Sequence, residues 1–165
     1  MVRLICVMGV AGCGKSTIGA DLAAALYVPF LEADQFHPAT NIAKMTAGTP
    51  LTDEDRWPWL DALGAGVPAA GRAVIACSAL RRVYRERLAA AAGDDVFFIH
   101  LAGTRDVILG RMATRTGHFM PPALIDSQFA TLERPSHDEP HIALDISAPP
   151  DILLTQALDA VKETT

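Results

Sequence analysis

Cysteine is scarce in this 165-residue chain, and its three cysteines follow no metal-ligand spacing. An odd number of cysteines cannot pair completely into disulfides. Cys6 and Cys77 lie in apolar runs that are typical of strands, where a free thiol behaves as a small buried residue. Such thiols are typical of a reducing compartment. We therefore expect a cytoplasmic protein and not a disulfide-stapled secreted one.

The sequence also lacks a long hydrophobic run and an excess of basic residues. The apolar segment from Leu4 to Val10 is far shorter than the roughly 20 residues that a membrane-spanning helix needs. The formal net charge is −5, whereas sequence-independent binding of nucleic acid needs a basic surface. We therefore expect neither a membrane nor a nucleic acid as partner.

The composition is that of a globular protein. Half of the residues are hydrophobic and 20% are charged, which argues against disorder. A chain of this length suits one domain with its own core. No repeat, low-complexity tract or linker divides it, so we predict a single domain over residues 1–165.

Short apolar runs alternate with helical patterns along the chain. The predicted strands are Leu4–Met8, Phe30–Glu32, Ala73–Cys77, Val96–Leu101 and Ile142–Ile146. The predicted helices are Lys15–Leu26, Thr40–Ala47, Asp53–Leu63, Arg81–Ala91, Arg105–Thr114, Ala123–Leu132 and Asp151–Lys162. This alternation predicts an α/β fold, in which helices cover both faces of a mostly parallel sheet.

A phosphate-binding motif stands between the first predicted strand and the first predicted helix. The segment Gly9–Thr17 fits G-x-x-x-x-G-K-[ST], which is informative only in that context. Glycines let backbone N–H groups turn around phosphate oxygens, and the helix N-terminus adds its dipole. Lys15 is expected to reach the terminal phosphates of ATP, and the Ser16 hydroxyl to bind Mg²⁺. The predicted nucleotide-binding residues are Gly9, Gly12, Cys13, Gly14, Lys15, Ser16 and Thr17.

Asp34 follows the second predicted strand, at the sheet edge where open α/β sheets bind ligands. Its carboxylate could accept a proton from an attacking hydroxyl or hold Mg²⁺, although an Asp here could also cap a helix or turn. The third strand ends in Cys77-Ser78, with no acidic residue. That absence argues against motor and switch NTPases, in which such an Asp holds the metal.

Arginine supplies eleven of the fourteen basic residues. Its planar guanidinium suits carboxylate and phosphate oxygens, although a GC-rich genome would give the same bias. Arg81 begins a predicted helix close to the end of the third strand and is a candidate to bind an anionic substrate. Arg85 and Arg87, further along that helix, are expected on its solvated face.

Arg111 and Arg115 are four residues apart and therefore share one helix face. They could close over the polyphosphate and stabilise its charge during transfer. No acidic residue lies four positions from Arg111, but a surface stripe of charge remains the alternative. The following loop, about 115–122, is a candidate lid, and the polar segment 34–59 is a second candidate for binding residues.

The sequence resembles the gluconokinases of the thermoresistant, adenylate-kinase-like type over nearly its whole length. The phosphate loop alone is common to many families. The stretches Pro50–Arg56 and Ser127–Glu133 are much more specific to this one, and Asp34–Pro38 and Gly117–Met120 add to them.

The resemblance implies ATP-dependent phosphorylation of D-gluconate at its 6-hydroxyl, giving 6-phosphogluconate and ADP. It implies a P-loop kinase fold with sheet order 2-3-1-4-5, an acceptor segment at about 34–60, a short lid and, as is frequent in the family, a homodimer. The implied catalytic residues are Lys15, Asp34, Arg111 and Arg115, with Arg111 also at the nucleotide and with Ser16 and Asp34 at Mg²⁺. The implied gluconate-binding residues are Asp34, Lys44, Arg56, Arg81 and His118, to which the hydrogen-bonding needs of gluconate add His37, Asp53 and Asp55.

Two alternatives stay open from the sequence. One is another small-molecule kinase of the same fold, acting on shikimate or on a nucleoside monophosphate. The other is a module that binds ATP without catalysis. A carboxylate on the acceptor side and arginines near the lid argue against the second alternative, because nucleotide binding alone requires neither.

Overall fold

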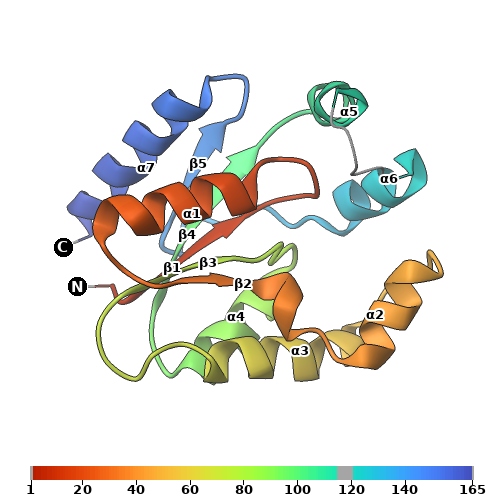
Figure 1. The fold of residues 1–165 in the computed structure, drawn as a ribbon, viewed down its shortest axis with the longest axis horizontal. Coiled ribbons are helices and arrows are strands. Elements are labelled where there is room, and N and C mark those ends of the chain that lie inside the picture. The colour runs from red at the N-terminus through yellow and green to blue at the C-terminus, as the bar shows by residue number, and fades with distance from the viewer. Residues whose placement is uncertain (1, 115–120, 165) are drawn as a thin grey trace.

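The computed structural model describes residues 2–114 and 121–164. Five strands form one parallel sheet in the order β2-β3-β1-β4-β5 (Figure 1). The strands are β1 (Leu4–Met8), β2 (Phe30–Glu32), β3 (Ala73–Ala76), β4 (Val96–Ala102) and β5 (His141–Asp145). The predicted α/β class and strand order are confirmed.

Every predicted helix is present, with bounds that differ from the prediction by at most two residues. A short 3₁₀ helix after β2, η1, was not predicted. None of the helices in the described ranges is both long and apolar enough to cross a bilayer. The helices are α1 (Lys15–Leu26), η1 (Ala33–Phe36), α2 (Ala39–Thr46), α3 (Asp53–Ala65), α4 (Arg82–Ala92), α5 (Arg105–Ala113), α6 (Pro122–Thr131) and α7 (Pro150–Glu163).

Strand β1 is apolar at every position because both of its faces are covered. Ile5 and Val7 join a core cluster with residues of α1 and α7. Leu4, Cys6 and Met8 face the opposite cluster, which contains residues of α3 and α4. A parallel sheet buried on both faces gives such continuous apolar runs. All three cysteines are buried and free, as expected from the sequence.

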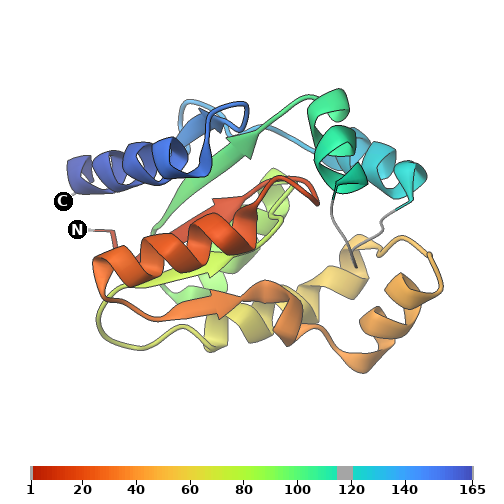
Figure 2. The same ribbon diagram turned by 45° about the horizontal axis from the view of Figure 1, so that its top comes forward.

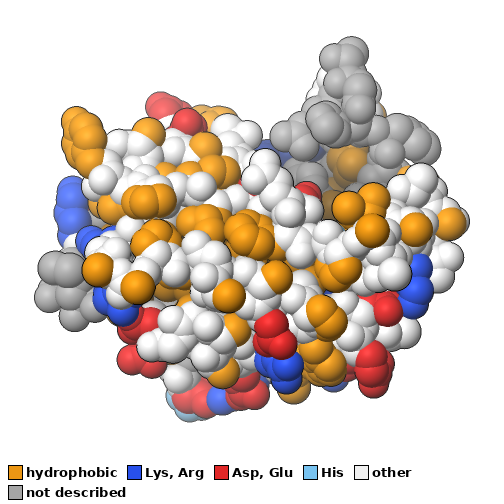
Figure 3. Space-filling model, turned by 60° about the horizontal axis from the view of Figure 1, so that its bottom comes forward, with side chains coloured by type: hydrophobic (Ala, Val, Ile, Leu, Met, Phe, Trp, Pro, Cys, Tyr) orange, Lys and Arg blue, Asp and Glu red, His pale blue; other side chains and the backbone are white. Residues whose placement is uncertain are grey.

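The carboxyl ends of the strands share one edge of the sheet. In Figures 1 and 2 the loop after β1, helix η1, and helices α5 and α6 lie at this edge, whereas the chain termini lie at the opposite one. On the face shown in Figure 3, acidic and basic side chains stand next to one another. The fold thus brings the loop after β1, η1, α5 and α6 to one edge of the sheet (Figures 1 and 2).

Arg85 overturns the prediction that its side chain lies on a solvated face. The residue is only 2% exposed. Its guanidinium donates hydrogen bonds to both carboxylate oxygens of Glu139, at 2.6 and 3.2 Å. It also donates to the backbone oxygens of Ala79, Leu80 and Glu133. The face of α4 that carries Arg85 is therefore an internal one.

Replacing Arg85 by alanine should lower the free energy of unfolding by about 3 kcal/mol, because the largely buried Glu139 carboxylate loses its cationic partner and the three backbone oxygens that Arg85 binds lose their donor. Urea denaturation measures the loss. The matched control is Arg87→Ala on the same helix, which removes an exposed pair with Asp61 and should change stability little. Equal losses for the two variants would contradict the structural role given to Arg85.

His100 in β4 makes stability depend on pH. Burial, aided by the positive charges of Arg134, Arg85 and His141, lowers the pKa of His100 to about 4. An unfolded histidine titrates near pH 6.5, so below that pH the unfolded state binds the extra proton and the folded state does not. The free energy of unfolding should therefore fall as pH drops from about 6.5 towards 4.

The His100→Gln variant should lose much of this dependence in urea denaturation series between about pH 7.5 and 5. The same change at the exposed His137 is the control and should keep the wild-type slope. An unchanged slope in His100→Gln would assign the acid sensitivity to other groups.

Candidate active site

A cleft of about 1090 Å³ opens at the carboxyl edge of the sheet. Its walls come from the phosphate loop, from η1, α2 and α3, from the loop between β3 and α4, and from α5 and α6. Eight of the predicted site residues line it. These are Gly12, Gly14, Lys15, Ser16, Thr17, Asp34, His37 and Arg56.

The phosphate loop requires glycine at Gly9. Its φ is +146°, and a Cβ there would lie 2.7 Å from Cys13 Sγ and 2.9 Å from the backbone oxygen of Leu101. Gly14, with φ +97°, is the N-cap of α1. Only glycine adopts such backbone conformations without cost. The chain therefore leaves β1 in a tight turn and enters α1 with its first N–H groups free for an anion.

The side chains of Cys13 and Lys15, both in the phosphate loop, differ in whether a ligand can reach them. Cys13 is fully buried, and burial raises the pKa of its thiol, so it can offer a ligand only its backbone. The Lys15 Nζ donates a hydrogen bond to the backbone oxygen of Val10 at 3.1 Å. The ammonium therefore lies across the mouth of the loop, where phosphate oxygens would be its next partners.

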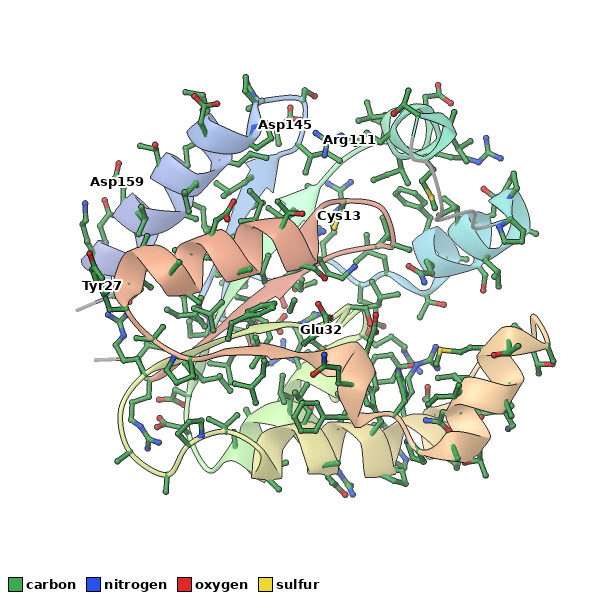
Figure 4. The ribbon with its side chains drawn as sticks, in the orientation of Figure 1. Cys13, Tyr27, Glu32, Arg111, Asp145 and Asp159 are labelled. Carbon is green, nitrogen blue, oxygen red and sulfur yellow. The ribbon has the colours of Figure 1, made fainter. Side chains whose placement is uncertain are left out.

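Glu32 is a site residue that the sequence analysis missed. It ends β2 and lines the cleft, and its carboxylate accepts a hydrogen bond from the Ser16 hydroxyl. Figure 4 shows Glu32 directly below the start of α1. Glu32 pairs in register with Ala76, the last residue of β3. The acid missing from the end of β3 is thus supplied by the neighbouring strand.

Ser16, Glu32 and Asp34 fit a hard cation. Mg²⁺ prefers hydroxyl, carboxylate and phosphate oxygens and usually keeps several waters. Within residues 2–114 and 121–164, no cluster of three or more His, Cys, Asp or Glu side chains could hold a metal ion alone. The described residues could therefore supply only part of the coordination, and bound phosphates would supply more.

Asp34 lies in the first turn of η1, beside an aromatic pair. The Trp59 Nε1 donates to the backbone oxygen of Ala33 at 2.8 Å, and the rings of Trp59 and His37 stack with centroids 4.3 Å apart. Burial lowers the pKa of His37, although the Asp34 charge opposes this shift. His37 therefore faces the cleft as a neutral ring next to a carboxylate.

A cationic cluster forms the wall of the cleft around Tyr84. The Tyr84 hydroxyl and the Arg81 guanidinium donate to the two carboxylate oxygens of Asp53, at 2.5 and 2.7 Å. The Arg56 guanidinium lies 4.9 Å from the centre of the Tyr84 ring. The Tyr84 hydrogen bond, with help from Arg81 and Arg56, lowers the pKa of Asp53. A second carboxylate, that of Glu133, lies 3.8 Å from Arg81 Nε, so the charge of Arg81 is balanced within the protein. Arg56 lines the cleft 3.9 Å from Asp53 and is the guanidinium best placed to meet an anionic ligand.

Lys44 and Asp55 are already bound to each other. The Lys44 Nζ donates to both Asp55 oxygens, at 3.0 and 2.8 Å, which lowers the pKa of Asp55 to about 2. Asp55 also forms a capping box with Thr52 at the start of α3. Lys44 is not among the residues that line the cleft. Its role at the acceptor stays a prediction, and Asp55 is explained by the cap.

Arg111 reaches from α5 towards the phosphate loop (Figure 4). One guanidinium nitrogen lies 3.9 Å from where a Cβ on Gly14 would stand, and the other donates to the backbone oxygen of Ile146. The position suits contact with a nucleotide held by the loop. Arg115, His118 and most of the predicted lid lie outside the described residues. Arg81 and its partner Asp53 are not among the residues that line the cleft, whereas Tyr84 is.

Known proteins resemble this chain along nearly its full length. A gluconokinase of Gluconobacter oxydans is 44% identical and covers 94% of this chain and 89% of its own length. The thermoresistant gluconokinase of Escherichia coli is 38% identical, with 94% and 91% covered. The chain belongs to the gluconokinase family.

Solved structures agree with membership in the gluconokinase family. A crystal structure of a gluconokinase from Sinorhizobium meliloti superposes with a TM-score of 0.91 at 43% identity, covering 98% of this chain and 93% of that one. A shikimate kinase family model also matches, over residues 11–134. Because a shikimate kinase structure from Aquifex aeolicus is only 14% identical, with a TM-score of 0.62, that likeness shows the shared fold.

Replacing Glu32 by glutamine should raise the Mg²⁺ concentration that gives half-maximal turnover by about 10-fold or more, because a carboxylate that orients the metal shell is lost. The rate at saturating ATP over a Mg²⁺ series measures this. Glu54→Gln, an exposed acid in the first turn of α3, is the control and should leave the Mg²⁺ curve in place. A superimposable curve for Glu32→Gln would remove Glu32 from the metal site.

Proposed function

We propose that this protein transfers the terminal phosphoryl group of ATP to the 6-hydroxyl of D-gluconate, giving 6-phosphogluconate and ADP. One observation carries the proposal: a single cleft holds a phosphate cradle with Lys15 on one side and Asp34 with Arg56 on the other. A kinase for an acidic sugar needs this combination. The gluconokinases named above, similar over nearly their whole length, support the choice of acceptor.

The chemistry that follows is mostly positioning and charge stabilisation. The loop N–H groups and Lys15 hold the polyphosphate oxygens. A bond forms between the 6-oxygen of gluconate and the terminal phosphorus as the bond to ADP breaks, and Asp34 accepts the hydroxyl proton. Mg²⁺, when bound through Ser16, Glu32 or Asp34, would neutralise charge on the phosphates.

The acceptor side supplies the groups that a sugar acid requires. Gluconate has one carboxylate and several hydroxyls, and it needs a cation with hydrogen-bonding partners around it. Arg56, which lines the cleft, would receive the carboxylate, and Arg81 would act behind it through Asp53, which lies between the two guanidinium groups. His37 and Tyr84 would bind hydroxyl groups. An acceptor without the carboxylate would leave Arg56 without an anionic partner in the cleft, which is a basis for rejecting neutral sugars.

We further propose the finer features implied by the family resemblance. Residues 34–60 form the acceptor segment and about 115–122 the lid, within one kinase domain over residues 1–165. Arg111 and Arg115 stabilise the phosphates when the lid closes, and Lys44 and His118 act near gluconate. The enzyme works in the cytoplasm, as a homodimer.

A panel of acceptors tests the proposal. ADP release should show a kcat/KM for gluconate at least about 100-fold above that for other sugar acids, shikimate and nucleoside monophosphates, because buried polar groups penalise acceptors that leave them unpaired. A higher kcat/KM for another acceptor would show that gluconate is not the substrate. If the protein binds ATP but turns over none of the acceptors, the alternative of a module that binds ATP without catalysis is favoured instead.

The control for the panel is Asp34→Asn, which should reduce gluconate turnover by about 10²- to 10⁴-fold if Asp34 is the base. A contaminating kinase would leave the measured rate unchanged in this variant. If the activity of Asp34→Asn is near normal and co-purifies with the protein, so that no contaminant accounts for it, Asp34 is not the base, while the substrate assignment stays intact.

A further inference from the structure

A side chain from α6 binds the phosphate loop. The backbone N–H of Ala11, the third residue of the loop, donates to the Gln128 Oε1 at 2.6 Å. A backbone N–H can donate only to the amide oxygen, so this bond fixes which way the Gln128 carboxamide points. The oxygen faces the loop, and the nitrogen must face elsewhere.

The Gln128 Nε2 has two N–H donors and no protein partner among residues 2–114 and 121–164. Gln128 lines the cleft together with Ser127 and Thr131 of the same helix. Because the two amide atoms share one carbon, the free donors stand directly beside the loop that would cradle the phosphates. The acceptor-side residues Asp34 and Arg56 line the same cleft.

The helix that carries Gln128 is also anchored at its far end. The Glu133 backbone N–H donates to the Leu80 oxygen at 2.7 Å, and its carboxylate accepts the Arg82 backbone N–H at 2.9 Å. The stretch Ser127–Glu133 therefore ties the phosphate loop to the loop between β3 and α4. A donor held in this way needs little reorganisation when charge develops near it.

We propose that Gln128 is a catalytic residue whose Nε2 donates a hydrogen bond to the phosphoryl group during its transfer. The proposal rests on the phosphoryl transfer proposed above and adds a residue to it. Charge in the transition state spreads over the phosphoryl oxygens, and neutral fixed donors stabilise it. Gln128 keeps both of its amide protons throughout, because the hydroxyl proton goes to Asp34.

Two substitutions distinguish this catalytic role from a purely structural one, in which Gln128 only holds the phosphate loop through the Ala11 hydrogen bond. Gln128→Glu keeps an oxygen to accept the Ala11 N–H but replaces the donor by a negative oxygen. Gln128→Met removes both contacts at similar size. If Gln128 donates to the phosphoryl group, both variants should lose about 10- to 100-fold in kcat, with Gln128→Glu at least as impaired. The KM for gluconate should change much less.

The pH dependence of kcat gives a second, independent readout. The carboxyl group that Gln128→Glu introduces gains an O–H donor when it is protonated, and neighbouring phosphates favour that protonated form. The ratio of Gln128→Glu to wild-type kcat should therefore rise as pH falls from about 8 to 5.5. The same ratio for Gln128→Met should stay flat, because methionine does not titrate.

The control is Asp126→Asn on the same helix as Gln128, which removes an exposed ion pair with Arg105 of α5 and should leave kcat unchanged. If Gln128→Glu keeps near-wild-type kcat and Gln128→Met loses it, only the hydrogen bond to the Ala11 N–H matters. Gln128 then has a structural role, and the proposal is overturned. A loss confined to the KM for gluconate would also overturn it. A wild type inactive on gluconate would refute the proposed function instead, and the comparison would then use whichever acceptor the panel identifies.

Discussion

The buried guanidinium of Arg85 is the interaction on which the acceptor side of the cleft depends. Ala79 has a φ of +44°, which is unfavourable for a residue with a side chain. Arg85 binds the backbone oxygens of Ala79 and Leu80 and is itself neutralised by Glu139. These bonds hold the strained turn, so that Ser78 and Leu80 stay on the cleft wall. The unfavourable backbone conformation of Ala79 therefore persists because the surrounding hydrogen bonds hold it in place.

Hydrogen bonds between segments that are distant in sequence hold the cleft together. The Gly9 N–H donates to the Ser78 oxygen, which joins the phosphate loop to the turn held by Arg85. Gln128 joins the same loop to α6 from the other side. The parallel sheet brings these segments to one edge, and the bonds then fix their spacing. Donor and acceptor sites are therefore set relative to each other by the protein before any ligand arrives.

The helices and strands could be predicted well from local sequence patterns. Strands buried on both faces appear as continuous apolar runs, and helices appear as apolar residues spaced three or four apart. The phosphate loop and Asp34 were also predictable, since strand ends locate the binding edge. Glu32 was missed because its importance comes from its neighbour in the sheet, Ala76, and not from its own motif. Arg85 was misplaced because its partner Glu139 lies 54 residues away. The Lys44 pair with Asp55 was hidden for the same reason.

The placement of the two tryptophans has an optical consequence. Both lie in α3. Trp59 stacks on His37, and Trp57 meets Tyr84 edge-on with ring centres 6.0 Å apart. Both indoles therefore rest against side chains of the acceptor wall, and the phosphate loop contains none. The intrinsic fluorescence of the unlabelled protein is a built-in reporter of the acceptor half of the cleft.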